Sequence, residues 1–509
     1  MDRFKIIIGV SFLFLILRIV FLDQSFLLPD ERDLSLTGYS ISKTGHDLFG
    51  NYMPLKFERI SPNSPLIPMY YDVLWWKLPI VRNVFNSRLA FVLPASLLPL
   101  LIFELVFLLT KKKNISYLTA LVFCFSPWIF NISRMGLEIN LALPFLLTAV
   151  ILQLRRKKIL SCLFYFFAFF SYQGFRPLII IVPFYFELYE QISKKFSLKK
   201  YLVSSTYYFL LFLFSIIISF FIENNLKSRS MNEIIFFSGK TLLGQFTHIF
   251  NSLLKGLGLS YLFKSGDYIP QYNNGVAGQF FASFFLFYFL GIVSLNKKTL
   301  GGYFLIGLAV LGMIPSVINI YSLTFSIRSS LAAVGLSALI AEGMIFGYEK
   351  LKKYNKYLKY SIILIFLAAI VFEAGTFFYN YFSIRPQLYA NIFNEKDKEL
   401  SVFLNGSTKK YLVRSPLPYS TFLSYLFMSD LTKEKLGTLP KMLKKNYDRY
   451  FFNKNRFEAC YANEAVVPEN LNETIIDETC LTALTKKDLD KKNYSKIYYF
   501  KKSAYYIFD

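Results

Sequence analysis

The sequence predicts an α-helical polytopic membrane protein with about eleven transmembrane helices and a small C-terminal α/β extracytoplasmic domain. Hydrophobic residues make up 54% of the 509 residues, including 57 Phe and 36 Tyr, and the mean hydropathy is +0.40. They form long runs, and about 18 consecutive apolar residues are typical of a bilayer span. Basic residues gather in short connectors between alternate runs, which is the positive-inside pattern.

The apolar runs place the spans in order along the chain. The first run follows Arg3 and Lys5 and has no small-residue cleavage site after it, so we expect a retained helix rather than a secretory signal. The expected spans lie near residues 5–22, 89–110, 115–131, 138–154, 159–173, 176–191, 202–222, 278–295, 299–317, 328–347 and 360–380.

The basic connectors set the expected orientation. They lie at 111–113, 155–158, 194–200, 296–298 and 349–359. All of them face the cytoplasm if the N-terminus is inside, and eleven spans then leave the C-terminus outside. We therefore expect a multi-pass protein of the cytoplasmic (inner) membrane, surrounded by membrane lipids.

The predicted domain organisation has a transmembrane domain over 1–380 and an extracytoplasmic domain over 381–509. Two long outside loops, 23–88 and 223–277, belong to the first domain, and the second loop carries amphipathic stretches expected along the membrane surface. In the C-terminal domain KKYLVRS and KIYYFKK alternate like strands, and PYSTFLSYLFM has the pattern of a helix.

The cysteines and the net charge narrow the function classes. Cys460 and Cys480 lie in the outside domain, where an oxidising compartment favours a disulfide over two free thiols. No CxxC pair exists and the chain has only 2 His, so a structural zinc site has no support. The net charge of +24 resides mainly in the connectors, which argues against nucleic-acid binding.

The stretch FLLPDERDLSLT, just after the first span, predicts a short helix outside the membrane. Pro29 suits its first position, Asp30 and Glu31 lie in its first turn, and Gly45 can end it. The acids either complement the helix dipole in water or reach the head group of a lipid.

Arginines recur at the outside ends of the spans among apolar neighbours. The positive-inside bias disfavours them there unless something anionic holds them; otherwise they snorkel or pair with a carboxylate. Glu138 follows Arg134 by four residues, so we expect the two on one helical face, where they can pair. These arginines are Arg59, Arg88, Arg134, Arg176 and Arg328.

A carboxylate together with several arginines fits the transfer of a sugar from a lipid phosphate to a hydroxyl. Such a transfer needs a base for the acceptor's proton, which Asp30 or Glu31 can supply. The phosphate leaving group needs cations rather than a general acid. Asp30 and Glu31 could also share a divalent cation, although no third ligand is evident.

These residues resemble the GT-C glycosyltransferases that use lipid-linked sugars, and most of all family 39, which contains protein O-mannosyltransferases and lipid A aminoarabinose transferases. The resemblance covers roughly residues 5 to 400. After the acidic pair, the stretches that carry it are SPNSPLIPMYYDVLWWKL, NSRLAFVLPASL, SRMGLEINLALPFLL, SYQGFRPLIIIVPFYF, FKSGDYIPQYNNGVAGQ and IPSVIN with FSIRSSLAAVGLSALIAEGM.

The resemblance implies an inverting transfer of a monosaccharide from a polyprenyl-phosphate donor to a lipid, protein or glycan hydroxyl. Asp30 matches the family's catalytic base, with Glu31 beside it. The expected substrate-binding residues, several of which match recurrent polar positions facing the outside cavity, are Arg32, Arg59, Arg88, Arg134, Glu138, Tyr172, Gln173, Arg176, Asp267 and Arg328.

The chain also departs from the family pattern, and other functions remain open. Asn63 and Ser64 stand where relatives often carry Lys before the prolines, Gln271 and Tyr272 replace Arg-His, and Phe325 replaces His. A polysaccharide polymerase or ligase, a transporter or flippase of lipid-linked sugars, and an inactive scaffold are the alternatives. Transporters tend to show internal repeats, which we do not find here.

Overall fold

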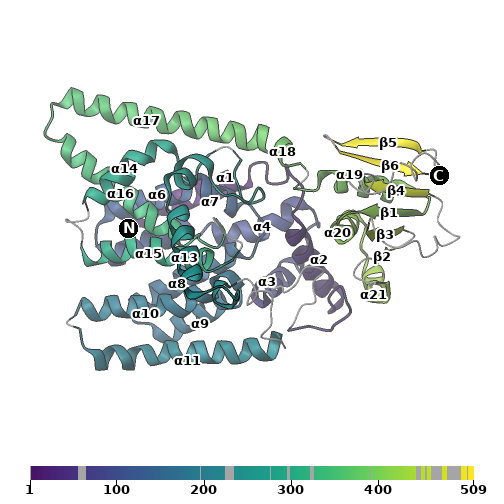
Figure 1. The fold of residues 1–509 in the computed structure, drawn as a ribbon, viewed down its shortest axis with the longest axis horizontal. Coiled ribbons are helices and arrows are strands. Elements are labelled where there is room, and N and C mark those ends of the chain that lie inside the picture. The colour runs from purple at the N-terminus through teal and green to yellow at the C-terminus, as the bar shows by residue number, and fades with distance from the viewer. Residues whose placement is uncertain are drawn as a thin grey trace. The chain divides into compact units, whose positions relative to one another are not determined.

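The computed structural model divides into two compact units, each built from segments far apart in the sequence. Unit 1 comprises Met1–Leu22 and Arg88–Arg385, and unit 2 comprises Asp23–Ser87 and Pro386–Asp509 (Figure 1). The described residues are 2–55, 65–194, 196–223, 234–275, 277–294, 299–320, 326–390, 392–442, 449–452, 455–459, 473–477, 494–500 and 503–508. The sequence-based division assigned the loop 23–88 to the membrane domain, whereas the structure groups it with the C-terminal segment.

Unit 1 is helical. A helix lies in each of the eleven ranges expected for spans, and α13 lies within the second long loop. The helices are α1 (Asp2–Ile19), α4 (Val84–Ala95, which begins in unit 2), α5 (Leu98–Thr110), α6 (Lys113–Phe125), α7 (Pro127–Ser133), α8 (Ile139–Leu154), α9 (Lys158–Phe169), α10 (Arg176–Ile192), α11 (Leu198–Glu223), α13 (Leu242–Gly256), α14 (Phe285–Val293), α15 (Leu300–Val317), α16 (Ala332–Leu351) and α17 (Lys356–Tyr379). The short α18 (Arg385–Leu388) begins at the last residue of unit 1 and continues in unit 2.

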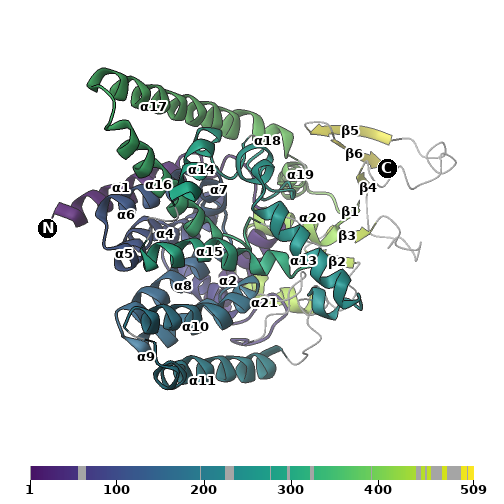
Figure 2. The same cartoon turned by 60° about the vertical axis from the view of Figure 1, so that its left-hand side comes forward.

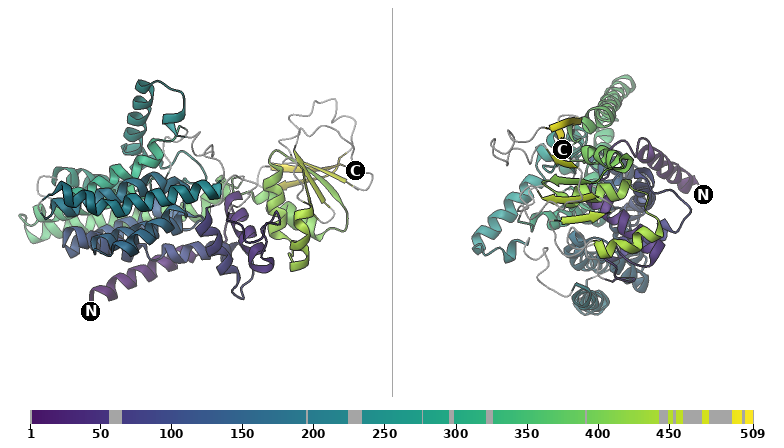
Figure 3. Two further views of the ribbon diagram at one scale, coloured as in Figure 1. Left: turned by 90° about the horizontal axis from the view of Figure 1, so that it is seen from below. Right: turned by 90° about the vertical axis from the view of Figure 1, so that its right-hand side faces the viewer.

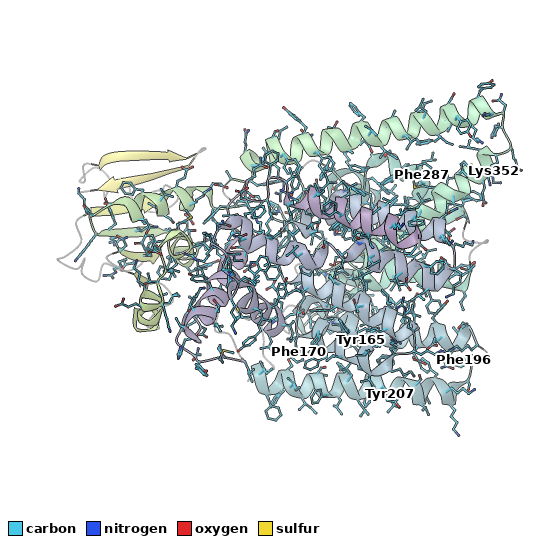
Figure 4. All side chains as sticks on the ribbon, turned by 180° about the vertical axis from the view of Figure 1, so that it is seen from behind. Tyr165, Phe170, Phe196, Tyr207, Phe287 and Lys352 are labelled. Carbon is cyan, nitrogen blue, oxygen red and sulfur yellow. The ribbon has the colours of Figure 1, made fainter. Side chains whose placement is uncertain are left out.

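Several of these helices are long and apolar enough to cross a bilayer. Within the described residues five meet this test, or six if the bent pair α6 and α7 forms one span. Helices α11 and α17 run along the edges of the unit 1 bundle and expose large apolar side chains, such as Phe221 and Phe372 (Figures 1 and 2). Figure 4 labels Tyr207, which is exposed on α11, and Tyr165, which is buried on α9. The chain is a multi-pass membrane protein, and the number of eleven spans stays a prediction.

Glycines allow the closest helix contacts in unit 1. A Cβ at Gly343 on α16 would collide with the carbonyl oxygen of Phe287 on α14, and one at Gly301 on α15 would collide with that of Leu109 on α5. Small residues are common at such interfaces because lipid offers no hydrophobic drive and the backbones must approach closely to pack. Figure 2 shows α14, α15 and α16 packed together.

Helix α13 has the amphipathic character expected for the second long outside loop. It is attached to the end of α15 by a hydrogen bond of 3.0 Å between His248 Nε2 and the carbonyl oxygen of Asn319. Its outward side carries a stripe of exposed apolar side chains, and lipid contact by that stripe stays a prediction. The stripe consists of Leu242, Leu243, Phe246, Phe250 and Leu254.

Unit 2 contains a mixed sheet of six strands in the order β2-β3-β1-β4-β6-β5 (Figures 1 and 3). The central strand β1 pairs in parallel with β3 and β4, and the other pairings are antiparallel. The strands are β1 (Tyr411–Ser415), β2 (Arg449–Phe452), β3 (Asn455–Ala459), β4 (Glu473–Asp477), β5 (Tyr494–Phe500) and β6 (Ser503–Phe508). The helices are α2 (Pro29–Thr44), α3 (Leu66–Trp76), α19 (Glu395–Gly406), α20 (Pro418–Met428) and α21 (Lys433–Met442).

The loop 23–87 supplies part of the hydrophobic core of unit 2. Phe26 and Leu36 from the loop are buried in one cluster with Leu404, Val413 and Phe422 from the C-terminal segment. The ring of Phe26 also packs edge-on against Phe427, with the ring centroids 5.8 Å apart. Burial of such side chains is the main favourable term in folding, so the two segments stabilise each other.

The glycine contacts give a prediction about packing. Gly343→Ala should destabilise unit 1 by about 1–3 kcal/mol because the added methyl forces α14 and α16 apart. Gly375→Ala on α17 is the matched control, since nothing lies within 4 Å of its Cβ position. Thermal unfolding in detergent, monitored by size-exclusion chromatography, should show a lower midpoint for Gly343→Ala but not for Gly375→Ala. Equal midpoints would contradict the close packing.

Candidate functional site

The two acidic residues at the start of α2 have different environments. Glu31 is buried, and its Oε2 accepts a hydrogen bond of 2.7 Å from the main-chain N–H of Leu28, which satisfies one of the free donors at the helix start. Asp30 is half-buried, and no hydrogen bond to its carboxylate occurs among the described residues. Of the two acids, Asp30 is therefore the one whose carboxylate accepts no hydrogen bond within the described part of the chain.

Arg32, expected to bind substrate, is instead fully buried inside unit 2. Its Nη2 donates to Ser420 Oγ at 2.9 Å, and its Nη1 donates to Ser424 Oγ. Burial lowers the pKa of Arg32 to about 10, and the nearby carboxylate of Asp397 opposes this change. The side chain still carries its charge at neutral pH. Arg59, Cys460 and Cys480 lie outside the described residues.

Arg134 and Arg88 hold the end of the first helix in unit 1. Arg134 Nη1 donates to the carbonyl oxygens of Arg18 at 2.8 Å and Val20 at 2.7 Å, and its Nη2 donates to that of Phe21 at 2.8 Å. Arg88 Nη1 donates to the carbonyl oxygen of Leu22 at 2.9 Å. The last carbonyl groups of a helix have no partner within it and carry partial negative charge, so cations stabilise them.

The expectation that Arg134 and Glu138 share a helical face is wrong. Helix α7 ends at Ser133 and α8 begins at Ile139, so the two residues lie in the turn between them. The side chain of Asn140 holds this turn by donating to the carbonyl oxygen of Met135 at 2.7 Å. Gly136 in the middle of the segment favours such a break because glycine is a poor helix former.

Arg385 is a further arginine in this region, and the sequence analysis missed it. It is buried, its Nε donates to the carbonyl oxygen of Asn273 at 3.1 Å, and its guanidinium lies 4.9 Å from the ring centroid of Tyr381. The charges of Arg88 and Arg385 both act on Arg134, so three cations lie near one another. Arg385 precedes a proline after an apolar run, as Arg176 does, and this signal could have revealed it.

The loop 266–281 is fixed to its surroundings by Asp267 and neighbouring residues. Asp267 Oδ2 accepts a hydrogen bond of 2.6 Å from the N–H of Ser326, which lies two residues before Arg328. Asn131 Nδ2 on α7 donates to the carbonyl oxygen of Tyr272 at 2.8 Å. These bonds connect the loop, α7 and the Arg328 segment. Arg328 itself is half-buried.

Tyr172, Gln173 and Arg176 lie together at the junction of α9 and α10. Gln173 begins a short 3₁₀ turn, Gln173–Phe175, and Arg176 is the first residue of α10. The guanidinium of Arg176 lies 5.0 Å from the ring centroid of Phe169, and the ring of Tyr172 packs against Phe175. The three expected residues thus occupy one break between helices.

The described residues give little support to a divalent cation at the acidic pair. They contain no group of three His, Cys, Asp or Glu side chains that could hold a metal ion. Glu31 is already engaged by the main chain of Leu28.

Comparison with solved structures gives the class of protein that this fold defines: the chain has the GT-C fold of membrane glycosyltransferases. It is similar to ArnT from Cupriavidus metallidurans in the apo state, with a TM-score of 0.52, 12% identity and coverage of 99% of this chain and 97% of that chain. The same enzyme bound to undecaprenyl phosphate gives a TM-score of 0.50, 9% identity and the same coverage.

A second similar protein is the archaeal oligosaccharyltransferase AglB from Archaeoglobus fulgidus, in complex with an inhibitory peptide and a dolichol-phosphate. Its TM-score is 0.50 with 11% identity, over 83% of this chain and 63% of that chain. No family model and no curated protein matches the sequence. The fold predicted from the sequence resemblance is confirmed.

The environment of Asp267 predicts a pH dependence. Burial raises its pKa to about 6, partly opposed by the hydrogen bonds that its carboxylate accepts. Because the unfolded chain ionises near pH 4, the stability that the protonated form provides is complete below about pH 4 and is lost as pH rises through 6, by up to about 3 kcal/mol. Thermal midpoints of wild type and Asp267→Asn should therefore diverge between pH 4 and 7, with wild type losing more. A constant difference across this range would contradict the assignment.

Proposed function

We propose that the protein is a membrane glycosyltransferase that moves a monosaccharide from a polyprenyl-phosphate donor to a hydroxyl acceptor on the extracytoplasmic side, with inversion. The observation that carries this proposal is the half-buried Asp30 carboxylate, which no described residue engages by a hydrogen bond, at the start of a well-held helix in a GT-C protein. The ligands bound in the similar structures, undecaprenyl phosphate and a dolichol-phosphate, support a donor of this class.

In the proposed reaction Asp30 acts as the general base. The acceptor oxygen attacks the anomeric carbon of the sugar while its proton moves to the Asp30 carboxylate. The bond between that carbon and the phosphate oxygen breaks, and its electron pair leaves with the polyprenyl phosphate. A single displacement of this kind inverts the anomeric centre. A well-placed base contributes about 10²–10⁴-fold to such a rate.

The arginines of unit 1 are proposed to bind the phosphate. Arg88, Arg134 and Arg385 form a group of neighbouring cations, and Arg328 lies in a segment tied to the loop 266–281. Guanidinium groups bind phosphate through pairs of parallel hydrogen bonds and offset the charge that develops on the leaving group. Arg134 also binds the carbonyl groups at the end of α1, so its substitution would disturb the structure as well as donor binding. Arg328 is therefore the better residue for testing donor binding.

Two alternatives remain in view. A polysaccharide polymerase or ligase would use the same base and the same phosphate contacts but would require a lipid-linked oligosaccharide as donor. A flippase of lipid-linked sugars would bind the donor without cleaving it, so Asp30→Asn would leave its transport unchanged. Assays with defined donors identify the sugar and the polyprenol, and assays with defined acceptors identify the acceptor.

The proposed role of Asp30 as general base can be tested by substitution. Asp30→Asn should reduce kcat by at least about 10²-fold because the amide cannot accept the acceptor's proton. The measurement is release of free polyprenyl phosphate from radiolabelled polyprenyl-phosphate monosaccharides, with purified protein in detergent. Asp23→Asn, at an exposed carboxylate of the same unit, is the control and should retain activity. Wild-type turnover by Asp30→Asn would exclude Asp30 as the base.

The proposed contact between Arg328 and the donor phosphate can be tested in the same way. Arg328→Ala should weaken donor binding about tenfold with a smaller effect on kcat, since a charge-assisted hydrogen bond contributes about 1.5–3 kcal/mol. The matched control is Arg155→Ala, which removes an arginine that is half exposed and pairs with Glu104. Equilibrium binding of a fluorescent donor analogue would measure both. Unchanged affinity for Arg328→Ala would remove this residue from the proposed site.

A further inference from the structure

Two hydroxyl groups on α20 hold the helix that carries Asp30. Ser420 and Ser424 are one helical turn apart and present their side chains on the same face of α20, where both accept hydrogen bonds from Arg32. Arg32 lies two residues after Asp30 on α2. All three partners are buried, with 0–1% of their surface exposed. The contact therefore joins α2 directly to the C-terminal segment inside unit 2.

Arg32 places a buried positive charge in this contact, and a buried charge contributes little to stability. Among carboxylates, that of Asp397 on α19 acts most strongly on the guanidinium, and it is itself held by Thr421 Oγ1 at 3.3 Å. Replacing buried charges by apolar residues is often neutral or stabilising, so stability alone gives little reason to keep an arginine here. A guanidinium with two fixed acceptors does, however, set one position and one orientation of α2.

The chain on the other side of Asp30 is also attached to the C-terminal segment. The main-chain N–H of Phe26, four residues before Asp30, donates to Glu395 Oε1 on α19 at 2.6 Å. The ring centroid of Phe26 lies 5.2 Å from the guanidinium carbon of Arg32, so the two attachments contact each other. Arg82 adds a third link by donating to the carbonyl oxygen of Ser429, at the end of α20, at 2.7 Å.

Asp30 thus lies between two attachments, and its own carboxylate accepts none of the hydrogen bonds that form them. A base must be held within about half an ångström of its working position, and side chains with locked neighbours achieve this best. We propose that α19 and α20 of the C-terminal segment position Asp30 for catalysis, with Arg32, Ser420, Ser424 and Glu395 as positioning residues. This inference rests on the proposed function of Asp30, and it assigns a role to the C-terminal domain.

The kinetic test uses the full-length protein with Ser420→Ala and Ser424→Ala combined. Release of polyprenyl phosphate should show kcat reduced by 10- to 100-fold per folded molecule and a donor KM within twofold of wild type. Ser420→Thr with Ser424→Thr keeps both hydroxyls and should restore most of kcat. The control is Ser401→Ala, which removes a buried hydroxyl of the same unit that does not contact Arg32.

A second measurement does not depend on activity. A nitroxide label is attached to Asp30→Cys in a background in which the four native cysteines are serine, and its mobility is measured by electron paramagnetic resonance. The alanine pair should increase the mobility, and the Ser401→Ala control should not. If kcat and mobility both stay at the wild-type values, the hydroxyls do not position Asp30 and the inference is overturned.

The two measurements separate the inference from the proposed function. If wild type releases no polyprenyl phosphate from any donor, the transferase proposal fails, and the mobility of the label still decides whether Ser420 and Ser424 hold this part of α2. If wild type is active and mobility rises in the alanine pair without a loss of kcat, the attachment exists but does not serve catalysis, which also overturns the inference.

Discussion

The free carbonyl groups at the end of α1 impose the constraint on which much of unit 1 depends. These groups are left without helical partners where an apolar helix ends, so they need donors from elsewhere in the protein. Arg134 donates to three carbonyl oxygens between Arg18 and Phe21, and Arg88 donates to that of Leu22. Arginine suits this task because its planar group donates several hydrogen bonds and never loses its charge. The result is a fixed end of the first helix of unit 1.

The same residue type therefore serves two purposes in this protein. Some arginines bind acceptors within the protein. Arg134 donates to carbonyl groups at the end of α1, and Arg32 donates to hydroxyl groups on α20. Others, such as Arg328, are half-buried in segments held by the loop 266–281, where a phosphate is the proposed partner. Positive charge at an outside helix end is thus only a first indication of a ligand, and the acceptors around each guanidinium decide its role.

Local patterns were sufficient for the helices but not for their long-range partners. Apolar runs predicted a helix in each expected range, and Pro29 and Gly45 marked the two ends of α2 correctly. The capping by Glu31 was within reach of the sequence, since an acid three positions into a helix often binds the helix start. The burial of Arg32 was not, because its partners lie on α20, almost 400 residues later. The break at Gly136 could have been predicted only if the poor helix propensity of glycine had been given more weight than the four-residue spacing of Arg134 and Glu138.

The composite core of unit 2 has a consequence for how the protein is made. The loop 23–87 leaves the ribosome roughly 300 residues before the C-terminal segment that completes its core. At the usual rates of synthesis this delay is on the order of 15–60 s. During that time Phe26 and Leu36 lack the partners that later bury them. The helix bearing Asp30 thus reaches its final arrangement only when the chain is complete, so an unfinished polypeptide in the membrane carries an immature acidic helix.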